Sequence, residues 1–420
     1  MNPKHLSRRK FVQDTGLAFA TAPWWLPGNI SQHYSSHVKS AMNTSSMIGA
    51  YGDWAASLVN DKPSPTSWLH DDWSSLSAWK QQAHNAVMDK LGMPDLKKAR
   101  EVTVNAHYVY DGLEIEEISW QLPYGPATEA IVLKPQGVQS PLPGVLAFHD
   151  HGGNKYFGKR KITRTSDKQH ELIVSHQQQY YEGQAWANEL ASRGYVVMVH
   201  DAFPFASRRV RLEDVSEHIR SGLTDENPER KHNIEAYNRW AGDHEHVMAK
   251  SLFCAGTTWP AVFLAEDQKA LDVLGSRSDV DETRLGCAGL SGGGMRTVFA
   301  GGLDDRIKCA VCVGFMTTWR DFLLHKSFTH TWMTYVPLLP NALDFPEILG
   351  LRVPLPTLVQ NDADDFLYTL PEMERADKIL QEIYEKADAS DRYRGSFYPG
   401  PHKFDRLMQA EAFAWFDRWL

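Results

Sequence analysis

The stretch Arg284-Leu-Gly-Cys-Ala-Gly-Leu-Ser291-Gly-Gly-Gly294 joins an apolar run to a cluster of small residues around a single serine. The apolar run that ends at Leu290 predicts a buried strand, and Gly293–Ala300 predicts a helix. A tight turn from strand to helix needs small residues beside its central position, so Ser291 is expected at the tip with its hydroxyl free. The backbone N–H of Gly292 then lies at a helix N-terminus, where it can donate to developing negative charge. Ser291 is therefore a candidate nucleophile.

Strand and helix patterns alternate on both sides of this turn. The predicted strands are Gly144–Phe148, Tyr195–His200, Arg284–Leu290, Ile307–Val313, Leu355–Gln360 and Arg394–Tyr398. The predicted helices are Trp186–Arg193, Leu264–Leu274, Gly293–Ala300, Met373–Lys386 and Phe404–Leu420. Such alternation predicts an α/β fold with a mostly parallel, doubly wound sheet that carries helices on both faces.

The residues before this region follow other periods. Alternating apolar residues predict three short antiparallel strands at one edge of the sheet, in the runs 102–108, 118–122 and 130–133. From Trp54 to Leu96, apolar residues recur at spacings of three and four, which predicts amphipathic helices. The expected domains are an N-terminal helical extension over 51–100 and the α/β domain over 101–420.

The first thirty residues resemble an export signal of the twin-arginine type. Ser7-Arg-Arg-Lys-Phe-Val-Gln13 carries the arginine pair, and an apolar stretch follows it. Residues 1–30 are interpreted as the signal and residues 31–50, rich in Ser, Asn and Met, as a linker. The signal predicts a periplasmic or secreted protein, whereas a chance arginine pair would leave it cytoplasmic. No other apolar run reaches the roughly eighteen residues of a membrane span, so stable membrane insertion is not expected.

Composition narrows the possible partners. The chain has 420 residues, of which 42% are apolar and 23% charged, and its formal net charge is −8. These values are typical of a globular protein and exclude a disordered or fibrous chain. No long basic run follows the first ten residues, so binding to a nucleic-acid backbone is not expected. The sequence leaves the oligomeric state open.

The four cysteines, Cys254, Cys287, Cys309 and Cys312, are too few and too late in the chain for a disulfide framework. Cys309 and Cys312 form a C-x-x-C pattern, which suggests redox or zinc chemistry when it opens a helix. Here the pattern falls in a predicted buried strand, where positions three apart face opposite sides. We therefore expect inert, buried thiols.

A serine nucleophile needs a base within hydrogen-bond reach and a carboxylate that orients this base. His402 is the candidate base, because it ends Phe397-Tyr-Pro-Gly-Pro-His402, a loop that follows the last predicted strand. A histidine in such a loop is free to point into a cleft. It also comes last in the chain order serine, acid, histidine that accompanies a serine turn of this kind.

The acid is expected in Asn361-Asp-Ala-Asp-Asp365, which places three carboxylates at the carboxyl end of a predicted strand. Asp364 is the first choice, because it lies three residues past the turn at Asn361. Asp365 is the second choice and Asp362 the third. A solvated acidic loop or a cation site is the alternative interpretation of the same cluster.

An oxyanion hole needs a second N–H donor besides Gly292. The segment His149-Asp-His-Gly-Gly-Asn154 ends a predicted strand, and its glycines allow the backbone to approach a reacting carbonyl. Gly153 or Asn154 is expected to supply this donor.

Two groups of histidines and acids offer metal binding as an alternative. One is His149 and His151 with His200 and Asp201, and the other is His244-Glu245-His246. Neither group has a recognised ligand spacing, so neither a metal nor another cofactor is expected.

Three segments interrupt the alternation of strands and helices. Residues 158–183 and 207–260 are polar and follow strand ends, where an open α/β sheet binds its ligand. Residues 317–349 carry the aromatic side chains Trp319, Phe322, Trp332 and Tyr335. These segments are interpreted as rims of a site, with surface decoration as the alternative.

Together these motifs resemble the α/β-hydrolase superfamily, specifically its acetyl-xylan-esterase and dienelactone-hydrolase-like branch. The resemblance covers about residues 100–420 and rests on His149-Asp-His-Gly-Gly153, Leu271–Asp281 with the serine turn, the Asp364 loop, and Tyr398-Pro-Gly-Pro-His402-Lys-Phe404. It implies an α/β-hydrolase catalytic domain in which Ser291 is the nucleophile, His402 the base and Asp364 the orienting acid. Asn361 stands where this family commonly has glycine, which leaves the choice between Asp364 and Asp365 open.

The expected activity is the hydrolysis of carboxylic esters through an acyl-enzyme, without a cofactor. The expected substrate is a small-molecule or carbohydrate ester, such as an acetylated plant polysaccharide. One alternative is a peptidase of the prolyl-oligopeptidase type, whose usual β-propeller does not fit in roughly a hundred residues. The other is a non-catalytic binding protein with the same fold.

Overall fold

The computed structural model describes residues 46–59, 62–96, 101–225 and 229–420. Within these ranges, Ser46–Leu420 forms one compact unit. The expected export signal lies outside the described residues, and so does the expected linker except for residues 46–50. The boundary expected at residue 100 between a helical extension and the α/β domain stays a prediction.

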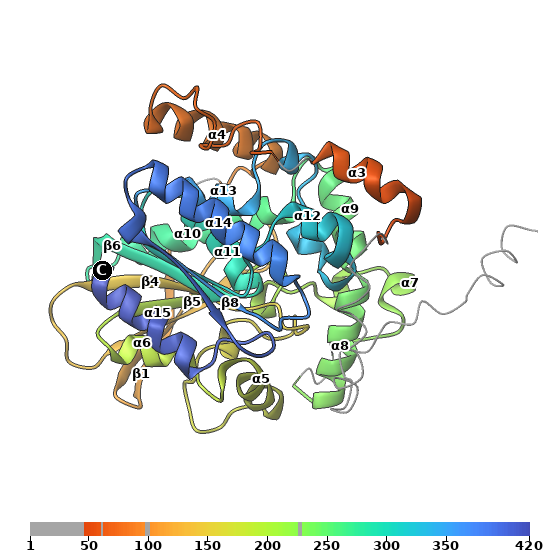
Figure 1. Ribbon diagram of the computed structural model, residues 1–420. Helices are drawn as coiled ribbons and strands as arrows, with labels where there is room; N and C mark the ends of the chain where they lie inside the picture. Colours follow the sequence, from red (N-terminus) through yellow and green to blue (C-terminus); the bar gives the residue numbers. More distant parts are fainter. Residues whose placement is uncertain (1–45, 60–61, 97–100, 226–228) are drawn as a thin grey trace, which may run out of the picture. The chain divides into compact units, whose positions relative to one another are not determined.

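Nine strands of the described residues form one sheet in the order β1-β2-β3-β5-β4-β6-β7-β8-β9 (Figure 1). The pairs from β5 to β9 are parallel, whereas β1, β2 and β3 pair antiparallel at one edge. This arrangement confirms the predicted sheet. The strands are β1 Thr103–Tyr110, β2 Leu113–Trp120, β3 Thr128–Pro135, β4 Leu142–Phe148, β5 Val196–His200, β6 Val280–Leu290, β7 Ile307–Val313, β8 Thr357–Asp362 and β9 Tyr393–Tyr398.

Helices connect the strands and cover the sheet. The helices are α3 Gly52–Leu58, α4 Leu76–Leu91, α5 Glu171–Tyr181, α6 Trp186–Ser192, α7 Glu217–Arg220, α8 Lys231–Asp243, α9 Glu245–Cys254, α10 Trp259–Gly275, α11 Gly292–Leu303, α12 Trp319–Asp321, α13 Phe345–Gly350, α14 Leu370–Lys386 and α15 Arg406–Trp419. Shorter turns are η1 Gly49–Tyr51, η2 Lys159–Lys161, η3 Ala206–Arg208, η4 Leu212–Asp214, η5 Phe322–Lys326, η6 Ser327–Thr329, η7 Trp332–Thr334, η8 Leu339–Asn341 and η9 Ser390–Arg392.

Capping residues set where several helices begin. Ser75 accepts a hydrogen bond from the backbone N–H of Ala78 at 3.1 Å and starts α4. Thr258 accepts from Ala261 N at 3.3 Å, and Pro260 lies in the first turn of α10. The predicted start of this helix at Leu264 was therefore too late, because the capping threonine and the proline precede the apolar periodicity.

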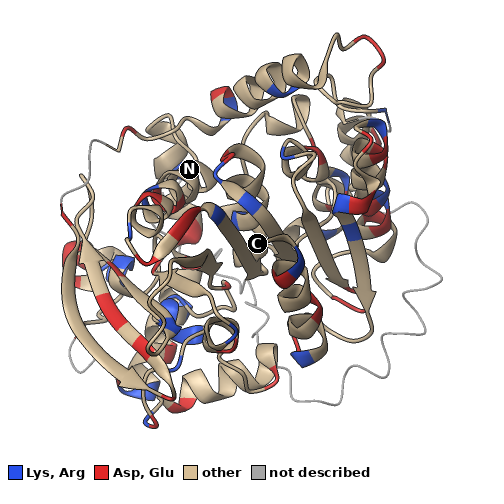
Figure 2. Ribbon diagram, turned by 90° about the vertical axis from the view of Figure 1, so that its left-hand side faces the viewer, with Lys and Arg blue, Asp and Glu red and all other residues tan. Residues whose placement is uncertain are grey.

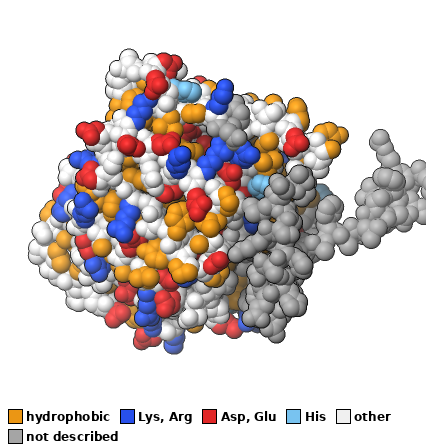
Figure 3. All heavy atoms as spheres, viewed as in Figure 1, with side chains coloured by type: hydrophobic (Ala, Val, Ile, Leu, Met, Phe, Trp, Pro, Cys, Tyr) orange, Lys and Arg blue, Asp and Glu red, His pale blue; other side chains and the backbone are white. Residues whose placement is uncertain are grey.

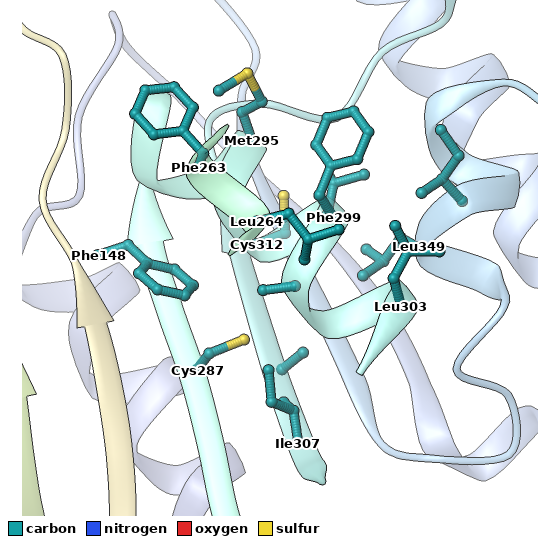
Figure 4. Close-up of a cluster of buried hydrophobic side chains, with 14 of the residues drawn as sticks. Phe148, Phe263, Leu264, Cys287, Met295, Phe299, Leu303, Ile307, Cys312 and Leu349 are labelled. Atoms are coloured by element: carbon teal, nitrogen blue, oxygen red, sulfur yellow. The ribbon is translucent and has the colours of Figure 1, made fainter. Parts of the chain in front are cut away.

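Two hydrophobic cores lie on opposite faces of the sheet. Along β4, Leu146 and Phe148 belong to one core, and Val145 and Ala147 belong to the other. The first core packs against α4, α10, α11, α13 and α14, and Figure 4 shows part of it between β6, β7 and α11. The second packs against α6 and α15. Burying one large apolar side chain stabilises the fold by about 1.5–3 kcal/mol, so both faces contribute strongly.

The C-x-x-C residues are divided between these cores. Cys309 belongs to the second core and Cys312 to the first, so their thiols face opposite sides of β7 as predicted. Both are buried and free, as is Cys287. Burial raises the pKa of the Cys287 thiol to about 12, and it also raises the pKa values of the other two. Such thiols are poor nucleophiles and poor metal ligands at neutral pH.

The long polar insertions contain more regular structure than their composition indicated. The segment 207–260 forms α7, α8 and α9. On α8, Ile234, Tyr237 and Ala241 recur at spacings of three and four and are buried in a third cluster of apolar residues. This short periodic signal was hidden because charged residues surround it. The insertion therefore builds a small core of its own beside the sheet.

The surface of the described unit carries both signs of charge. Acidic and basic residues are spread over helices, strands and loops in Figure 2, and their side chains are interspersed on the face drawn in Figure 3. Among the described residues, no single helix is both long and apolar enough to cross a membrane, although α9 and α10, bent by 85°, pass that test as a pair.

Candidate active site

Ser291 occupies the turn between β6 and α11. Its backbone has φ +60° and ψ −116°, a conformation that costs a non-glycine residue about 1–3 kcal/mol and that is found mainly at functional sites. Two hydrogen bonds hold the turn: Ser291 N donates to the carbonyl of Val313 at 2.9 Å, and Met295 N donates to the carbonyl of Ser291 at 2.9 Å. The serine thus lies at the tip of a strand-to-helix turn, where its sequence context placed it.

The glycines on either side of the serine are required by close backbone approaches. A Cβ on Gly289 would lie 2.7 Å from the carbonyl oxygen of Phe148, and a Cβ on Gly293 only 2.4 Å from the same oxygen. Real Cβ atoms do not approach a backbone oxygen so closely, so any larger residue would push β4 away from the turn. These two glycines allow β4 and its following loop to lie directly beside Ser291.

His402 and Asp365 form the contact expected of a base and its orienting acid. His402 Nδ1 lies 2.6 Å from Asp365 Oδ2, and Asp365 Oδ1 accepts from Leu367 N at 2.9 Å. Because Nδ1 donates to the carboxylate, Nε2 is the basic nitrogen of this imidazole. Nε2 is buried and has no hydrogen-bond partner among the described residues.

The His402 ring also lies beside the strand end that holds the serine turn. A Cβ on Gly314 would be 3.0 Å from His402 Cε1, the carbon next to Nε2. Gly314 directly follows Val313, whose carbonyl accepts the Ser291 N–H. Three segments far apart in the sequence therefore meet at the carboxyl ends of β6, β7 and β8.

Asp364, the first choice from the sequence, has a different contact. Its carboxylate accepts from Gly400 N at 3.0 Å, and its own N–H donates to the carbonyl of Gly400 at 3.2 Å. It is exposed, whereas Asp365 is buried. The choice of Asp364 is therefore corrected in favour of Asp365, the second choice, because the turn after β8 directs Asp365 inward and Asp364 toward the His402 loop.

Asp362, the third choice, lies close to both residues without orienting the imidazole. One oxygen of each carboxylate and one His402 nitrogen lie within 4.8 Å of one another. Asp362 Oδ2 accepts from Lys403 N at 2.9 Å, and Oδ1 has no partner among the described residues. Burial raises the pKa of Asp362 to about 7, so this carboxyl group is partly neutral at physiological pH.

The charge of Asp365 governs the protonation of His402. Burial by itself disfavours the imidazolium, but the attraction of the Asp365 carboxylate and the hydrogen bond to it outweigh burial and raise the pKa of His402 above its ordinary value. The pair therefore stabilises the protonated state that a base reaches when it removes a proton.

The loop after β4 offers a different candidate for the second oxyanion donor from the two that the sequence suggested. Gly153 N donates to His151 Nδ1 at 3.1 Å, and Asn154 N donates to the carbonyl of His151 at 3.1 Å. Both N–H groups are therefore occupied within the loop. A Cβ on Gly292 would lie 3.1 Å from His151 N, which has no acceptor among the described residues. His151 N thus replaces Gly153 and Asn154 as the candidate partner of the Gly292 N–H.

Glu245 fixes the His151 side chain by a direct contact. Because Nδ1 of His151 accepts from Gly153, Nε2 carries the proton and donates to Glu245 Oε1 at 2.9 Å. The same carboxylate pairs with Lys155 at 2.6 Å and accepts from Thr331 Oγ1 and Trp332 N. Burial opposes its charge, but Lys155 and His151 keep the pKa of Glu245 well below its usual range.

A second buried group supports the same loop. Lys161 Nζ donates to the carbonyls of Asp150 and His151 at 2.8 and 2.9 Å. The Asp150 carboxylate in turn accepts from His176 at 3.1 Å and from Tyr181. Burial lowers the pKa of Lys161 to about 8 despite the neighbouring Asp150 charge. Sequence reasoning considered Glu245 only as a metal ligand and missed Lys161, because a single charged residue in a polar insertion carries no pattern.

Residues of both groups considered as metal sites make other contacts. In the second group, Glu245 contacts His151 and Lys155, and the His244 ring stacks on Trp240 with centroids 4.7 Å apart. In the first group, His149 Nδ1 lies 3.0 Å from the carbonyl of Asp150, and its Nε2 accepts from Ala202 N at 3.2 Å. His200 Nε2 contacts Asp267 at 2.9 Å beside Arg296, deep in the core. Asp201 pairs with Lys159 at 2.8 Å. These side chains form separate hydrogen-bonded pairs and do not converge on one point.

The aromatic rim is smaller than the sequence suggested. Trp319 and Phe322 are buried in the first core, because they pack against Phe345 on α13. Trp332 is 41% exposed, and its backbone N–H is held by Glu245. Phe366, directly after Asp365, is 68% exposed and faces the exposed Phe328 ring with centroids 6.2 Å apart.

Comparison with known proteins connects this geometry to a fold. A crystal structure described as a "putative acetyl xylan esterase" from Bacteroides fragilis NCTC 9343 superposes with a TM-score of 0.62, at 14% identity, over 84% of this chain and 82% of that chain. The chain has the α/β-hydrolase fold. A glucuronoyl esterase from Solibacter usitatus is a further structural neighbour of this hydrolase fold, with a TM-score of 0.57, 13% identity, and coverage of 85% and 97%.

Sequence comparisons point to the same fold. The profile of the prolyl oligopeptidase family matches residues 259–345, which run from α10 to the start of α13 and include the serine turn. The "Putative hydrolase YtaP" of Bacillus subtilis (strain 168) is 26% identical over 331 residues, which are 78% of this chain and 95% of the relative. The family profile thus covers the part of the chain that forms α10, β6, the serine turn and β7.

Proposed function

We propose that this protein is a serine hydrolase that cleaves carboxylic esters through an acyl-enzyme. The observation that carries the proposal is the 2.6 Å contact between His402 Nδ1 and Asp365, which leaves a buried basic Nε2 beside the serine turn. The comparisons support this proposal, because the structural neighbours named above are described as esterases and the sequence relative is described as a hydrolase.

In the proposed reaction, His402 Nε2 takes the proton of Ser291 Oγ while this oxygen attacks the ester carbonyl carbon. The tetrahedral intermediate then expels the alcohol, which receives the proton from His402. Water enters next, loses a proton to the same nitrogen and attacks the acyl-enzyme. The carboxylic acid leaves, and the proton returns to Ser291. Asp365 holds the imidazole in one tautomer throughout.

The oxyanion of the intermediate is proposed to accept hydrogen bonds from the N–H groups of Gly292 and His151. Gly292 begins α11, so the partial positive charge of the helix N-terminus adds to its effect. His151 is held by Glu245, which contacts its imidazole, and by Lys161, which donates to its carbonyl. Donors that are fixed before the reaction stabilise the oxyanion without reorganisation at the moment of attack.

A carbohydrate ester is the proposed substrate class. Two structural neighbours are described as an acetyl xylan esterase and a glucuronoyl esterase, and both descriptions name carbohydrate esters. Trp332 and Phe366 offer exposed aromatic faces next to Glu245 and Asp365, and such faces pack well against the apolar side of a sugar ring. Export by the Ser7–Gln13 motif is part of the same proposal, since a polysaccharide substrate lies outside the cell.

Peptide hydrolysis is the second candidate, because the prolyl oligopeptidase profile matches residues 259–345. We expect kcat/KM for acetylated xylo-oligosaccharides and for an aryl acetate to exceed that for the matching peptide anilide by at least about tenfold, or 1.4 kcal/mol in transition-state free energy. Initial rates across one panel of substrates measure this. A peptide anilide that is hydrolysed as fast as the esters would favour the peptidase.

The pH dependence of the reaction should follow His402. Only the neutral imidazole accepts the serine proton, and Asp365 raises the pKa of His402 above about 6.5. We therefore expect kcat/KM on an aryl acetate to fall with decreasing pH, with a midpoint above pH 6.5. In Asp365→Asn the residual activity should have a lower midpoint, because the carboxylate charge is gone. A midpoint below pH 6.5 in the unaltered protein contradicts this assignment.

A further inference from the structure

Two adjoining cavities lie beside the loops at one edge of the sheet. The first has a volume of about 260 Å³ and reaches Arg211 at its far end. The second has a volume of about 320 Å³ and reaches Asn105. Both are lined by Ala127, Glu129 and Lys159, so they lie side by side, and the two together are named here the edge groove. None of the residues assigned above to the reaction lines it.

The edge groove follows the same edge of the sheet as the candidate active site. Glu129 lies at the start of β3, which pairs antiparallel with the carboxyl end of β5 through Ala130 and His200. The strand order β3-β5-β4-β6 then leads to Ser291, which directly follows β6. Neighbouring strands are about 4.8 Å apart, so the groove begins about 14 Å from the serine turn along this edge. A short oligosaccharide spans such a distance.

Four basic side chains line the first cavity, against two acidic ones. Lys159 is paired with Glu129 and Asp201, both at 2.8 Å, and Arg160 is paired with Glu229 at 3.2 Å. The remaining two, Arg209 and Arg211, have no carboxylate within 4.0 Å among the described residues. In the described part of the chain, two of the four basic side chains of this cavity therefore form no ion pair.

Arg209 is held in place as a ligand-binding group would be. Its guanidinium carbon lies 4.8 Å over the centre of the buried Tyr156 ring, and Nη1 donates to the carbonyl of Ala206 at 3.0 Å. Nε is buried and has no acceptor among the described residues. A buried donor without an acceptor is unfavourable, and a fixed guanidinium is suited to a planar carboxylate.

We infer that the edge groove binds an acidic saccharide, with the carboxylate of a uronic-acid residue on Arg209 and Arg211. This inference rests on the proposed function, since it names a second recognition site for the same carbohydrate ester. The second cavity favours a saccharide over a small anion, because Asn105, Glu117 and Ser119 line it with amide, carboxylate and hydroxyl groups that bind sugar hydroxyls. An inorganic anion would occupy only the basic end.

Binding of trigalacturonate to the full chain, measured by calorimetry, tests this inference without any need for hydrolysis. We expect trigalacturonate to bind at least tenfold more tightly than xylotriose, and each of Arg209→Ala and Arg211→Ala to weaken it at least tenfold. Arg209→Lys should retain part of the affinity, because it keeps the charge but loses the planar fork. Arg418→Ala, which removes an exposed charge from α15, is the matched control and should bind as the unaltered protein does.

Two outcomes would overturn the inference. Equal affinity for trigalacturonate and xylotriose would show that the groove does not recognise a carboxylate. If inorganic phosphate binds as tightly as trigalacturonate and this binding also requires the arginines, the edge groove is a general anion site.

Hydrolysis of an aryl acetate by Arg211→Ala should stay within twofold of the unaltered rate. If the unaltered protein binds trigalacturonate but hydrolyses no ester, the proposed function is contradicted and the inference about the edge groove is unaffected.

Discussion

Replacement of Ser291 by alanine is expected to lower kcat for hydrolysis of a short aryl ester on the order of 10⁶-fold. The substitution removes the oxygen that is proposed to attack the ester and leaves the Gly292 and His151 N–H groups in place. These donors still polarise a bound carbonyl, so a residual rate about 10³–10⁴-fold above that in water should remain. Covalent labelling by a fluorophosphonate, followed by intact-mass measurement, should disappear in the same variant.

Alanine at this position keeps the backbone strain of the native turn, because it retains the Cβ that makes φ +60° unfavourable. The melting temperature should therefore change little, which separates lost chemistry from lost folding. Ser251→Ala, on the exposed face of α9, is the control and should keep full activity and labelling. An Ser291→Ala protein that is folded and retains a tenth of the activity would exclude Ser291 as the nucleophile.

The second large effect is expected at the acid, where two adjacent aspartates should differ sharply. Asp365→Asn should lower kcat on the order of 10⁴-fold, because an amide that donates to Nδ1 favours the wrong imidazole tautomer. Asp364→Asn should stay within about threefold of the unaltered rate, because its carboxylate contacts Gly400 N and not the imidazole. Side-by-side kinetics on one aryl ester measure the difference.

Asp362→Asn completes the comparison. Its carboxyl group has a pKa of about 7 and does not orient His402, so the neutral amide should cost at most about tenfold. Equal, small losses in Asp365→Asn and Asp364→Asn would mean that another carboxylate orients the base. A loss of 10⁴-fold in Asp362→Asn alone would move that role to Asp362, the nearest other acid.

Patterns that repeat along the chain could be predicted well. The alternation of strands and helices identified the parallel sheet, and the changed period before β4 identified the antiparallel edge. The serine turn could also be predicted, because a Cβ at Gly289 or Gly293 would collide with one backbone oxygen of a neighbouring strand, so both positions require glycine. In these cases the physical requirement is local or periodic, so it leaves a visible pattern in the sequence.

The finer geometry of the site could not be predicted in this way. Which of Asp364 and Asp365 points inward depends on the hydrogen bonds between the Asp362 turn and the Gly400 loop, segments that are far apart in the sequence. The loop after β4 is similar, since the N–H groups of Gly153 and Asn154 donate to His151 and are not free for another acceptor. In both cases, hydrogen bonds that form only in the folded chain decide which of the neighbouring residues is available to the site. The residue pattern of the segment alone does not contain this information.

The position of the three side chains along the chain has a consequence for biosynthesis. A ribosome completes α11 and β7 soon after Ser291, but β9 and the loop with His402 emerge only after β8 and α14. A nascent chain that ends before β9 therefore contains Ser291 but lacks His402. The proposed reaction predicts that such a truncated chain does not hydrolyse esters, and that hydrolysis requires the segment that carries His402.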